Sequence, residues 1–488
     1  QRATAPPRPV RTHSSPPGDV GVLPSPCFRF ARCRMSQYPF GIIFPRGYEM
    51  KKVLMYSFAA FLLIALATGP LFAGGGQEEA GDSEAQESGN AADNTVVTIG
   101  YNRFLSSSFG PGPAPIDAIK DEVARRYPDI QVELNILPDT TSGMRDAISV
   151  WMTAQDGTVD IYGMDTPWVL EFGRAGWALP LGGELPQLAD DFIDSGLEIY
   201  THEGDALGVP FWGSISGMYF RSDLLEEYDL EVPQTYSQMQ EAMDVILADR
   251  PEMTGFSWPA GKGEWLVMVF SDFLYGFGGS YTDGEGNYAF DSPEALQALQ
   301  FMVGLIEGGY TPVNATAWNG EEARRPFVAG EAIFSWGNSD MVIWLDDPER
   351  SQVVEQWGFT TSPAELDGEQ VGITGGFAFS VNPYTDTRDE TLKVMEVIAD
   401  FDVQKAFALA WGPVQYYDGL YDDSEVLEAN PNADRITAVL DSAKSRPPSV
   451  RYSQLSSILQ EEIHAALTGG KTPRSALEAA NERINALQ

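Results

Sequence analysis

Hydrophobic and polar residues follow two different spacings along the first part of the chain, and these spacings predict strands separated by helices. Residues 96–101 and 130–136 alternate with a period of two, and the second stretch reads IQVELNI. Residues 116–127 and 143–154 instead repeat hydrophobic positions with the period of a helix. Strands that alternate with helices predict a mostly parallel sheet covered by helices on both faces.

The same spacings predict the elements that follow. A short strand is expected at residues 159–162 and a helix at residues 167–175. Residues 281–290 read YTDGEGNYAF, which predicts a hairpin about a glycine-rich turn. Further helices are predicted at residues 237–248, 293–307, 388–399, 403–410, 453–467 and 473–486.

In open sheets of this kind, ligands bind beyond the carboxyl ends of the strands. The segments that follow predicted strands are therefore the places to search for a site. They are residues 102–109, 163–168, 211–216, 335–340 and 375–377.

An apolar run near residue 53 departs from this pattern. Two lysines follow Met50, an apolar stretch continues to about Ala67, and Leu-Phe-Ala73 precedes three glycines. This order is typical of a secretory signal peptide, and the run is short for a membrane span of about 20 residues. We expect translation to start at Met50, residues 50–73 to be the signal peptide, and the product to be periplasmic or secreted. Residues 1–49, rich in Arg and Pro, are then untranslated or unfolded.

Residues 74–93 are glycine-rich, polar and acidic, and they are expected to form a flexible tether. Cys27 and Cys33 are the only cysteines, and both precede Met50. The mature chain is therefore expected to have no disulfide, thiolate metal site or lipid-anchored cysteine.

Charge narrows the range of partners. Of 31 basic and 70 acidic residues, nine basic and two acidic ones precede Val53, which leaves 22 basic and 68 acidic residues. Nucleic acids and anionic membranes both require basic patches, so neither is an expected partner. A large net charge keeps a protein soluble and is one adaptation to saline habitats.

Motifs of common enzymes are absent from the sequence. It contains no HExxH, GxSxG or GxxxxGK[ST] stretch, and its three histidines are far apart. Residues 283–287 match the start of a calcium-binding loop. The match ends there, because such a loop needs glycine at its sixth position and Tyr288 occupies it. No cofactor or metal is predicted. Glycoside hydrolysis by a pair of carboxylates stays an alternative, because 68 acidic residues allow many pairings.

Tryptophans supply the candidate binding chemistry, since their flat faces can stack on the C–H faces of a sugar ring. Trp168, Trp212, Trp336 and Trp411 lie in or near loops, and Trp258 and Trp265 flank WPAGKGEW. Buried tryptophan is often simply part of the core. That interpretation is preferred for Trp151, Trp177 and Trp344.

Six segments occur in the order known from one family. They are DIYGMDTPWVLEFGRAGWALPL, GVPFWGSISGMYFRSDLLEEYDLEVPQTYSQMQEAM, GEWLVMVFSDFLYGFGGSYTDGEG, FVAGEAIFSWGNSD, GITGGFAFSVNPYTD and GGKTPRSALEAANERIN. From residue 96 to residue 486, the chain resembles the extracellular solute-binding proteins of ABC importers, family 1. Within that family it is similar to the maltose/trehalose-type sugar binders.

The resemblance implies an α/β fold of the type II periplasmic-binding-protein class, with two hinge-linked lobes and a ligand cleft between them. Lobe 1 is expected to comprise residues 94–208 and 333–382, and lobe 2 residues 209–332 and 383–488. Gly208–Arg221 would be the first crossing, with Phe211 and Trp212 facing the cleft and Tyr219-Phe220 beginning the second sheet. The chain would cross back near residues 332–336 and again near residues 380–383.

The resemblance also implies ligand contacts and a function. The implied contacts are Asp165, Trp212, Trp336, Gly376, Phe377, Trp411, Arg103 and Glu264. Close sugar binders often carry an acid at Ser214 and a tryptophan at Phe377, so these departures bear on the choice of sugar.

The implied function is that of a monomeric binding component, without a cofactor. It would carry a di- or oligosaccharide to the permease subunits of an ABC transporter. The alternatives are a polyol, glycerophosphodiester or peptide ligand, a secreted glycosidase, or a role in presenting sugar to a chemosensor.

Overall fold

The computed structural model describes residues 94–365, 367–412 and 414–488. The predicted upstream segment, signal peptide and tether lie outside these residues. Within the described residues, no helix combines the length and the apolar character that a membrane crossing requires.

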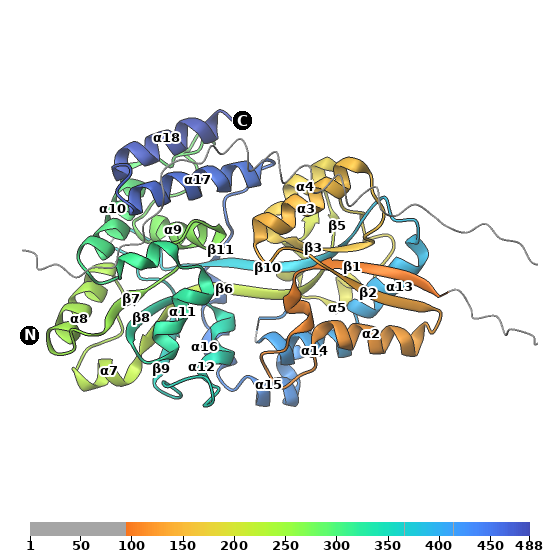
Figure 1. Ribbon diagram of the computed structural model, residues 1–488, viewed down its shortest axis with the longest axis horizontal. Coiled ribbons are helices and arrows are strands. Elements are labelled where there is room, and N and C mark those ends of the chain that lie inside the picture. The colour runs from red at the N-terminus through yellow and green to blue at the C-terminus, as the bar shows by residue number, and fades with distance from the viewer. Residues whose placement is uncertain (1–93, 366, 413) are drawn as a thin grey trace, which may run out of the picture. The chain divides into compact units, whose positions relative to one another are not determined.

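Three parallel strands form the centre of the first lobe (Figure 1). Strand β1 (Thr95–Tyr101) lies between β2 (Ile130–Ile136) and β3 (Ile161–Asp165). The predicted alternation in β1 is confirmed, since Val97 and Ile99 are completely buried. The helices of this part are α2 (Pro115–Arg126), α3 (Thr141–Ala154) and α4 (Val169–Ala175).

Two long strands join this lobe to the second one (Figure 1). Strand β6 (Val209–Arg221) pairs antiparallel with β10 (Gly372–Val381) through its first half. Its second half pairs with β8 (Ala332–Asn338) and β9 (Trp357–Thr360). Strand β6 therefore pairs with strands of both lobes, at the position where the resemblance implied the first crossing.

The sheet that results is mixed rather than mostly parallel. Its order is β2-β1-β3-β10-β6-β8-β7, where β7 is Thr254–Ser257, and β9 pairs with β6 off this path. Strand β10 runs antiparallel to both β3 and β6. The strands within each lobe are parallel where a helix connects them, and the crossing strands supply the antiparallel pairs.

The expected return near residues 332–336 is wrong. Strand β8 pairs with β7 and with the second half of β6, so it stays in the second lobe. The chain returns on β10, which reaches β3 in the first lobe. A buried strand within a sheet and a crossing strand carry the same apolar pattern, which explains the error.

The second lobe packs helices around β7 and β8 (Figure 1). Its core includes Trp258, Phe270 and Phe273, all buried. The predicted helices at 237–248, 293–307, 453–467 and 473–486 are confirmed within one or two residues. The helices of this lobe are α7 (Ser222–Glu227), α8 (Tyr236–Asp249), α9 (Glu264–Gly276), α10 (Pro293–Glu307), α11 (Gly320–Val328), α17 (Tyr452–Leu467) and α18 (Pro473–Asn485).

Helices α13 (Arg388–Ile398) and α14 (Phe401–Trp411) lie with the first lobe, although residues 383–488 were expected in lobe 2. Both pack against α2, and α13 also contacts β1. Their buried side chains, such as Val394 and Phe407, join the core that contains Val97. The apolar faces of α13 and α14 cover the first lobe's sheet, so the chain enters the second lobe later than expected.

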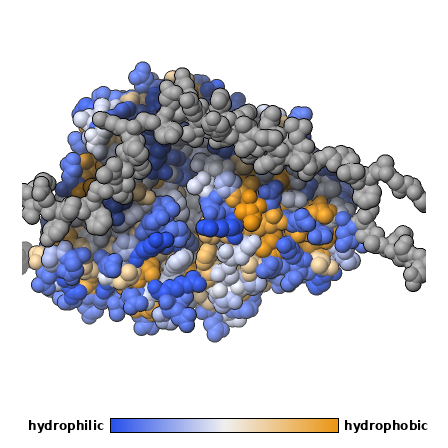
Figure 2. All heavy atoms as spheres, viewed as in Figure 1, coloured by the Kyte–Doolittle hydropathy of each residue, from blue (hydrophilic) through white to orange (hydrophobic). Residues whose placement is uncertain are grey.

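The predicted hairpin within residues 281–290 takes the form of a small turn. Thr282 and Tyr288 form an isolated bridge, and the side chain of Asp283 caps the turn between them. Figure 2 shows one face of the molecule, on which hydrophilic residues predominate. The remaining elements are η1 (Arg103–Ser106), η2 (Thr166–Trp168), α5 (Leu188–Asp191), α6 (Asp194–Glu198), β4 (Thr201–His202), β5 (Asp205–Ala206), η3 (Val313–Ala317), η4 (Ser339–Met341), α12 (Val342–Leu345), η5 (Leu420–Asp422), α15 (Ser424–Ala429), α16 (Ala433–Thr437), η6 (Leu440–Ser442) and β11 (Ala443–Lys444).

Candidate functional site

Three adjacent strands place three of the predicted site residues in one row. Phe377 on β10 lies opposite Asp165 on β3 and opposite Trp212 on β6. The rings of Trp212 and Phe377 stack with centroids 6.1 Å apart, and both side chains are partly exposed. A buried carboxylate therefore lies beside the Phe377 ring, and Trp212 follows on the next strand.

Gly376 lets the two crossing strands approach each other beside this row. Its φ of 151° is a conformation that L side chains rarely adopt. A Cβ atom added there would lie 2.5 Å from the Trp212 carbonyl oxygen and 3.1 Å from the Tyr200 hydroxyl. Only glycine fits this position without a shift of the strands.

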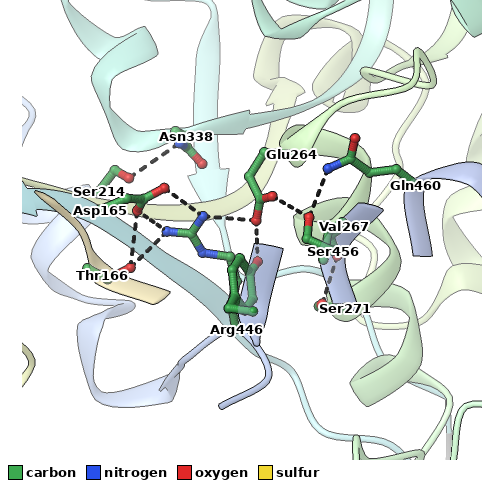
Figure 3. Close-up of polar contacts among 11 residues, drawn as sticks. Asp165, Thr166, Ser214, Glu264, Val267, Ser271, Asn338, Arg446, Ser456 and Gln460 are labelled. Atoms are coloured by element: carbon green, nitrogen blue, oxygen red, sulfur yellow. Dashed lines mark hydrogen bonds and ion pairs between the residues drawn. The ribbon is translucent and has the colours of Figure 1, made fainter. Parts of the chain in front are cut away.

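Arg446, which the sequence analysis did not select, links the two lobes (Figure 3). One terminal nitrogen donates to Asp165 Oδ2 at 3.1 Å and to Glu264 Oε1 at 3.0 Å. The other donates to Asp165 Oδ1 and to Thr166 Oγ1, the latter at 2.8 Å. Asp165 belongs to β3 and Glu264 to α9, so one guanidinium holds carboxylates from both lobes.

Glu264 is held from a second side by α17. It accepts hydrogen bonds from the Tyr452 hydroxyl and from Ser456 Oγ, the latter at 2.6 Å. Figure 3 shows the contact with Ser456. Glu264 is also the first residue of α9, where the helix dipole favours a negative charge. These contacts fix the carboxylate that meets Arg446.

Burial and charge act in opposite directions in this cluster. Burial raises the pKa of Asp165, and the charge of Arg446 opposes that rise. Burial, the largest single effect, lowers the pKa of Arg446, but the charges of Asp165, Tyr452 and Glu264 together outweigh it and raise that pKa above its usual range. Arg446 thus opposes the effect of burial on Asp165 by donating to it from two nitrogens.

Two buried polar atoms beside the row have no hydrogen-bond partner within the described part of the chain. They are the hydroxyl of Tyr200, a completely buried residue, and Nε of Arg446. Buried polar groups without partners are uncommon in native proteins.

A cavity of about 210 Å³ opens next to Arg446. Residues of the first lobe form one wall, and the segment around Arg446 forms the other. Its lining residues are Thr166, Pro167, Val169, Leu170, Ile199, Thr201, His202 and 445–449. The cavity gives the Arg446 cluster an open side.

Three other predicted contacts lie elsewhere. Trp336 is buried in the second lobe and donates its N–H to Asp272 at 2.5 Å. Trp411 donates its N–H to the Ser107 carbonyl oxygen at 2.9 Å and packs in the first lobe's aromatic core. Arg103 is exposed and pairs with Asp139. The structure brings Asp165, Trp212, Gly376, Phe377 and Glu264 together but not these three.

Phe211 does not share the outward orientation expected for it. Its ring is buried and stacks on Phe379, with centroids 4.0 Å apart. The pairing of β6 with β10 shifts register here, with Trp212 opposite Phe377 and Pro210 opposite Ala378, so Phe211 is an extra residue at an irregularity.

Sequence reasoning missed Arg446, Thr166, Tyr200 and Tyr452. Arg446 and Asp165 are 281 residues apart, so no local pattern connects them. The usable signal was weak: the arginine lies in an SRPPS segment in a chain with few basic residues.

Known proteins place the chain in a family. Residues 107–405 match the profile described as bacterial extracellular solute-binding protein. The chain belongs to this family. A probable ABC transporter-binding protein from Deinococcus radiodurans is 25% identical to this solute-binding protein over 341 residues, which is 67% of this chain and 79% of the relative. A mannitol-binding protein from Pseudomonas aeruginosa is 22% identical and covers 67% of this chain and 72% of its own length.

Solved structures agree with the fold of this solute-binding protein. Maltose-bound MalE3 of T. maritima has a TM-score of 0.73 and 26% identity, covering 81% of this chain and all of that one. A ribitol-bound solute-binding protein from Agrobacterium radiobacter K84 has the same TM-score at 19% identity, covering 81% of this chain and all of its own. The relatives named here are binding proteins. Across the described ranges, no group of three His, Cys, Asp or Glu side chains is arranged to hold a metal ion.

Proposed function

We propose that this solute-binding protein is the exported, monomeric substrate-binding component of an ABC importer for a carbohydrate. The observation that carries the proposal is the row of Asp165, Phe377 and Trp212 beside the Arg446 bridge between lobes. Carboxylates accept hydrogen bonds from sugar hydroxyls, and aromatic rings offer faces for sugar C–H groups. The named relatives, including transporter-binding, mannitol-binding and maltose-bound proteins, support this choice.

The two-lobed arrangement suggests how binding would be signalled. A solute that contacts both Asp165 on the first lobe and Glu264 on the second favours the form in which the lobes are close. Its effect equals the difference between its affinities for the open and closed forms. The closed form would then dock on the permease.

The arrangement of the carboxylates favours binding over hydrolysis. A glycosidase needs one carboxyl group that is protonated and free to donate to the leaving group. Asp165 and Glu264 both accept hydrogen bonds from Arg446. Neither is placed as a free acid, so the glycosidase alternative is less well supported.

Intrinsic tryptophan fluorescence and thermal unfolding would test the proposal on the chain from Gly74. The panel would contain maltose, trehalose, sucrose, cello- and xylo-oligosaccharides, mannitol and an amino-acid mixture. A bound sugar at 100 times its dissociation constant should stabilise the fold by about 2.7 kcal/mol. Chromatography of the mixture should show no product. A response only to amino acids, or turnover of a sugar, would contradict the proposal.

A further inference from the structure

The hydrogen-bonding capacity of Arg446 is almost completely used. A guanidinium has five N–H donors, four of them on the terminal nitrogens. Those nitrogens make four contacts, two with Asp165 and one each with Glu264 and Thr166. Only the N–H of Nε has no partner in the described chain. An anion could not take the usual two-point grip on Arg446 without displacing Asp165.

The charge of the cluster also opposes an anion. Asp165 and Glu264 contribute two negative charges against the single positive charge of Arg446, and all three side chains are largely buried. The N-terminus of α9 would otherwise attract an anion, but Glu264 already occupies it. A phosphate or carboxylate entering here would therefore be repelled.

The hydroxyl groups of an uncharged solute match the hydrogen-bonding atoms of the cluster better than an anion does. A hydroxyl can donate to a carboxylate and can also accept from the free N–H of Arg446. The cavity beside Arg446 is lined by further neutral hydroxyl-bearing residues, Thr166 and Thr201. The partly exposed rings of Trp212 and Phe377 provide an apolar face.

We infer that this site selects uncharged hydroxylated solutes and rejects their phosphorylated or carboxylated counterparts, because Asp165 and Glu264 already neutralise Arg446. The inference rests on the proposed function, since it assumes that this cluster receives the transported solute. It separates neutral sugars and polyols from glycerophosphodiesters, which the fold alone would allow.

Matched solute pairs test the selection on the intact protein. Glucose would be compared with glucose 6-phosphate and gluconate, glycerol with glycerol 3-phosphate, and mannitol with mannitol 1-phosphate. The neutral member should produce a given rise in melting temperature at a concentration at least tenfold lower than its anionic partner requires. An anion that binds as well as its parent overturns the inference while the carbohydrate assignment stands. If glycerol or mannitol binds but no sugar does, the inference stands while the carbohydrate assignment is contradicted.

Inorganic phosphate gives a second test that does not depend on the identity of the solute. Asp165→Asn removes one negative charge and releases donors of Arg446, so 10 mM phosphate should raise its melting temperature by about 2 °C or more. Phosphate should leave the parent protein unchanged at equal ionic strength. Asp129→Asn is the matched control, because exposed Asp129 precedes β2 at the opposite end of the parallel strands.

Glu264→Gln also removes one negative charge, from the carboxylate that contacts one of the same Arg446 nitrogens, and it replaces Asp165→Asn if that variant does not fold. The same phosphate response is expected from it. Equal responses to phosphate in the parent, the site variant and the Asp129→Asn control would overturn the inference.

Discussion

The Arg446 side chain binds a carboxylate of the first lobe, Asp165, and a carboxylate of the second lobe, Glu264. Its side chain is 3% exposed, as is that of Asp165, so neither charge is solvated by bulk water. The attraction between buried charges compensates for their lost hydration only while every partner is present. The stability of this part of the molecule therefore depends on the complete cluster.

Replacing Arg446 by methionine should destabilise the protein by about 3 to 5 kcal/mol, because two buried carboxylates lose their counter-charge. Urea unfolding at pH 7 would measure the change. Arg103→Met is the matched control, since Arg103 is exposed and pairs only at the surface. Its effect should stay within about 1 kcal/mol. Similar losses in both variants would show that the cluster has no special role.

Single residues also show where sequence reasoning stops. Asp165, Phe377 and Trp212 were implied by the family resemblance, and each lies in one of the segments expected to follow a strand. Their alignment depends on strand pairing, which the resemblance implied and local pattern could not give. Arg446 escaped because its partners are distant in sequence. Trp336 lies in a Gly/Ser/Asp-rich stretch like that of an exposed loop, yet a buried carboxylate receives its N–H.

At the scale of elements, Asp272 connects α9 to both crossing strands. Ser216 on β6 donates to Asp272 Oδ2 at 2.7 Å, and the Ile373 amide on β10 donates to the same serine oxygen at 2.7 Å. Trp336 on β8 donates to Oδ2 as well. The Asp272 carboxylate and the Ser216 hydroxyl bound to it thus connect α9 with three strands of the sheet.

This position makes stability depend on pH. Burial raises the pKa of Asp272 to about 7, and the tyrosines Tyr236 and Tyr281 are the other titratable groups that face it. Between about pH 4 and pH 7, Asp272 therefore keeps its proton in the folded state, whereas the same side chain is ionised in the unfolded state. This contribution is complete below pH 4 and is lost as the pH rises through 7.

Asp272→Asn keeps an acceptor oxygen but cannot ionise. The variant should therefore not show the loss of stability that ionisation of Asp272 causes as the pH rises. Between pH 5 and pH 8, the parent should lose about 3 kcal/mol of stability relative to the variant. Urea titrations at both values would measure the difference, with Asp129→Asn as an exposed control. Parallel pH profiles for the parent and Asp272→Asn would contradict the assignment.

Element boundaries were largely readable from the sequence, whereas their assembly was not. The helix at 293–307 was predicted to the residue, because a serine cap, a proline and a regular apolar spacing all agree. The return between lobes was misplaced because β8 and β10 carry similar apolar and glycine-containing runs. Which of two such runs crosses is decided by pairing with β6, a contact of long range.

At the scale of the whole molecule, the excess of acidic residues produces mutual repulsion. The chain after Lys52 carries 68 acidic and 22 basic residues. Raising NaCl from 10 mM to 1 M shortens the Debye length from about 30 Å to about 3 Å and should raise the melting temperature. Calorimetry would show this at pH 7.5. Near pH 4, where many carboxylates are protonated, the same salt should have much less effect.

Each lobe is built from stretches that are separated along the chain, and this affects how the protein can be made. Strands β1, β2 and β3 need β10, α13 and α14 to cover them, yet residues 222–371 emerge from the ribosome before β10 does. A nascent chain that ends at residue 371 therefore leaves the first lobe's apolar strands uncovered, a state prone to aggregation. The second lobe likewise waits for α17 and α18. Both lobes must finish folding late, after nearly the entire chain has left the ribosome.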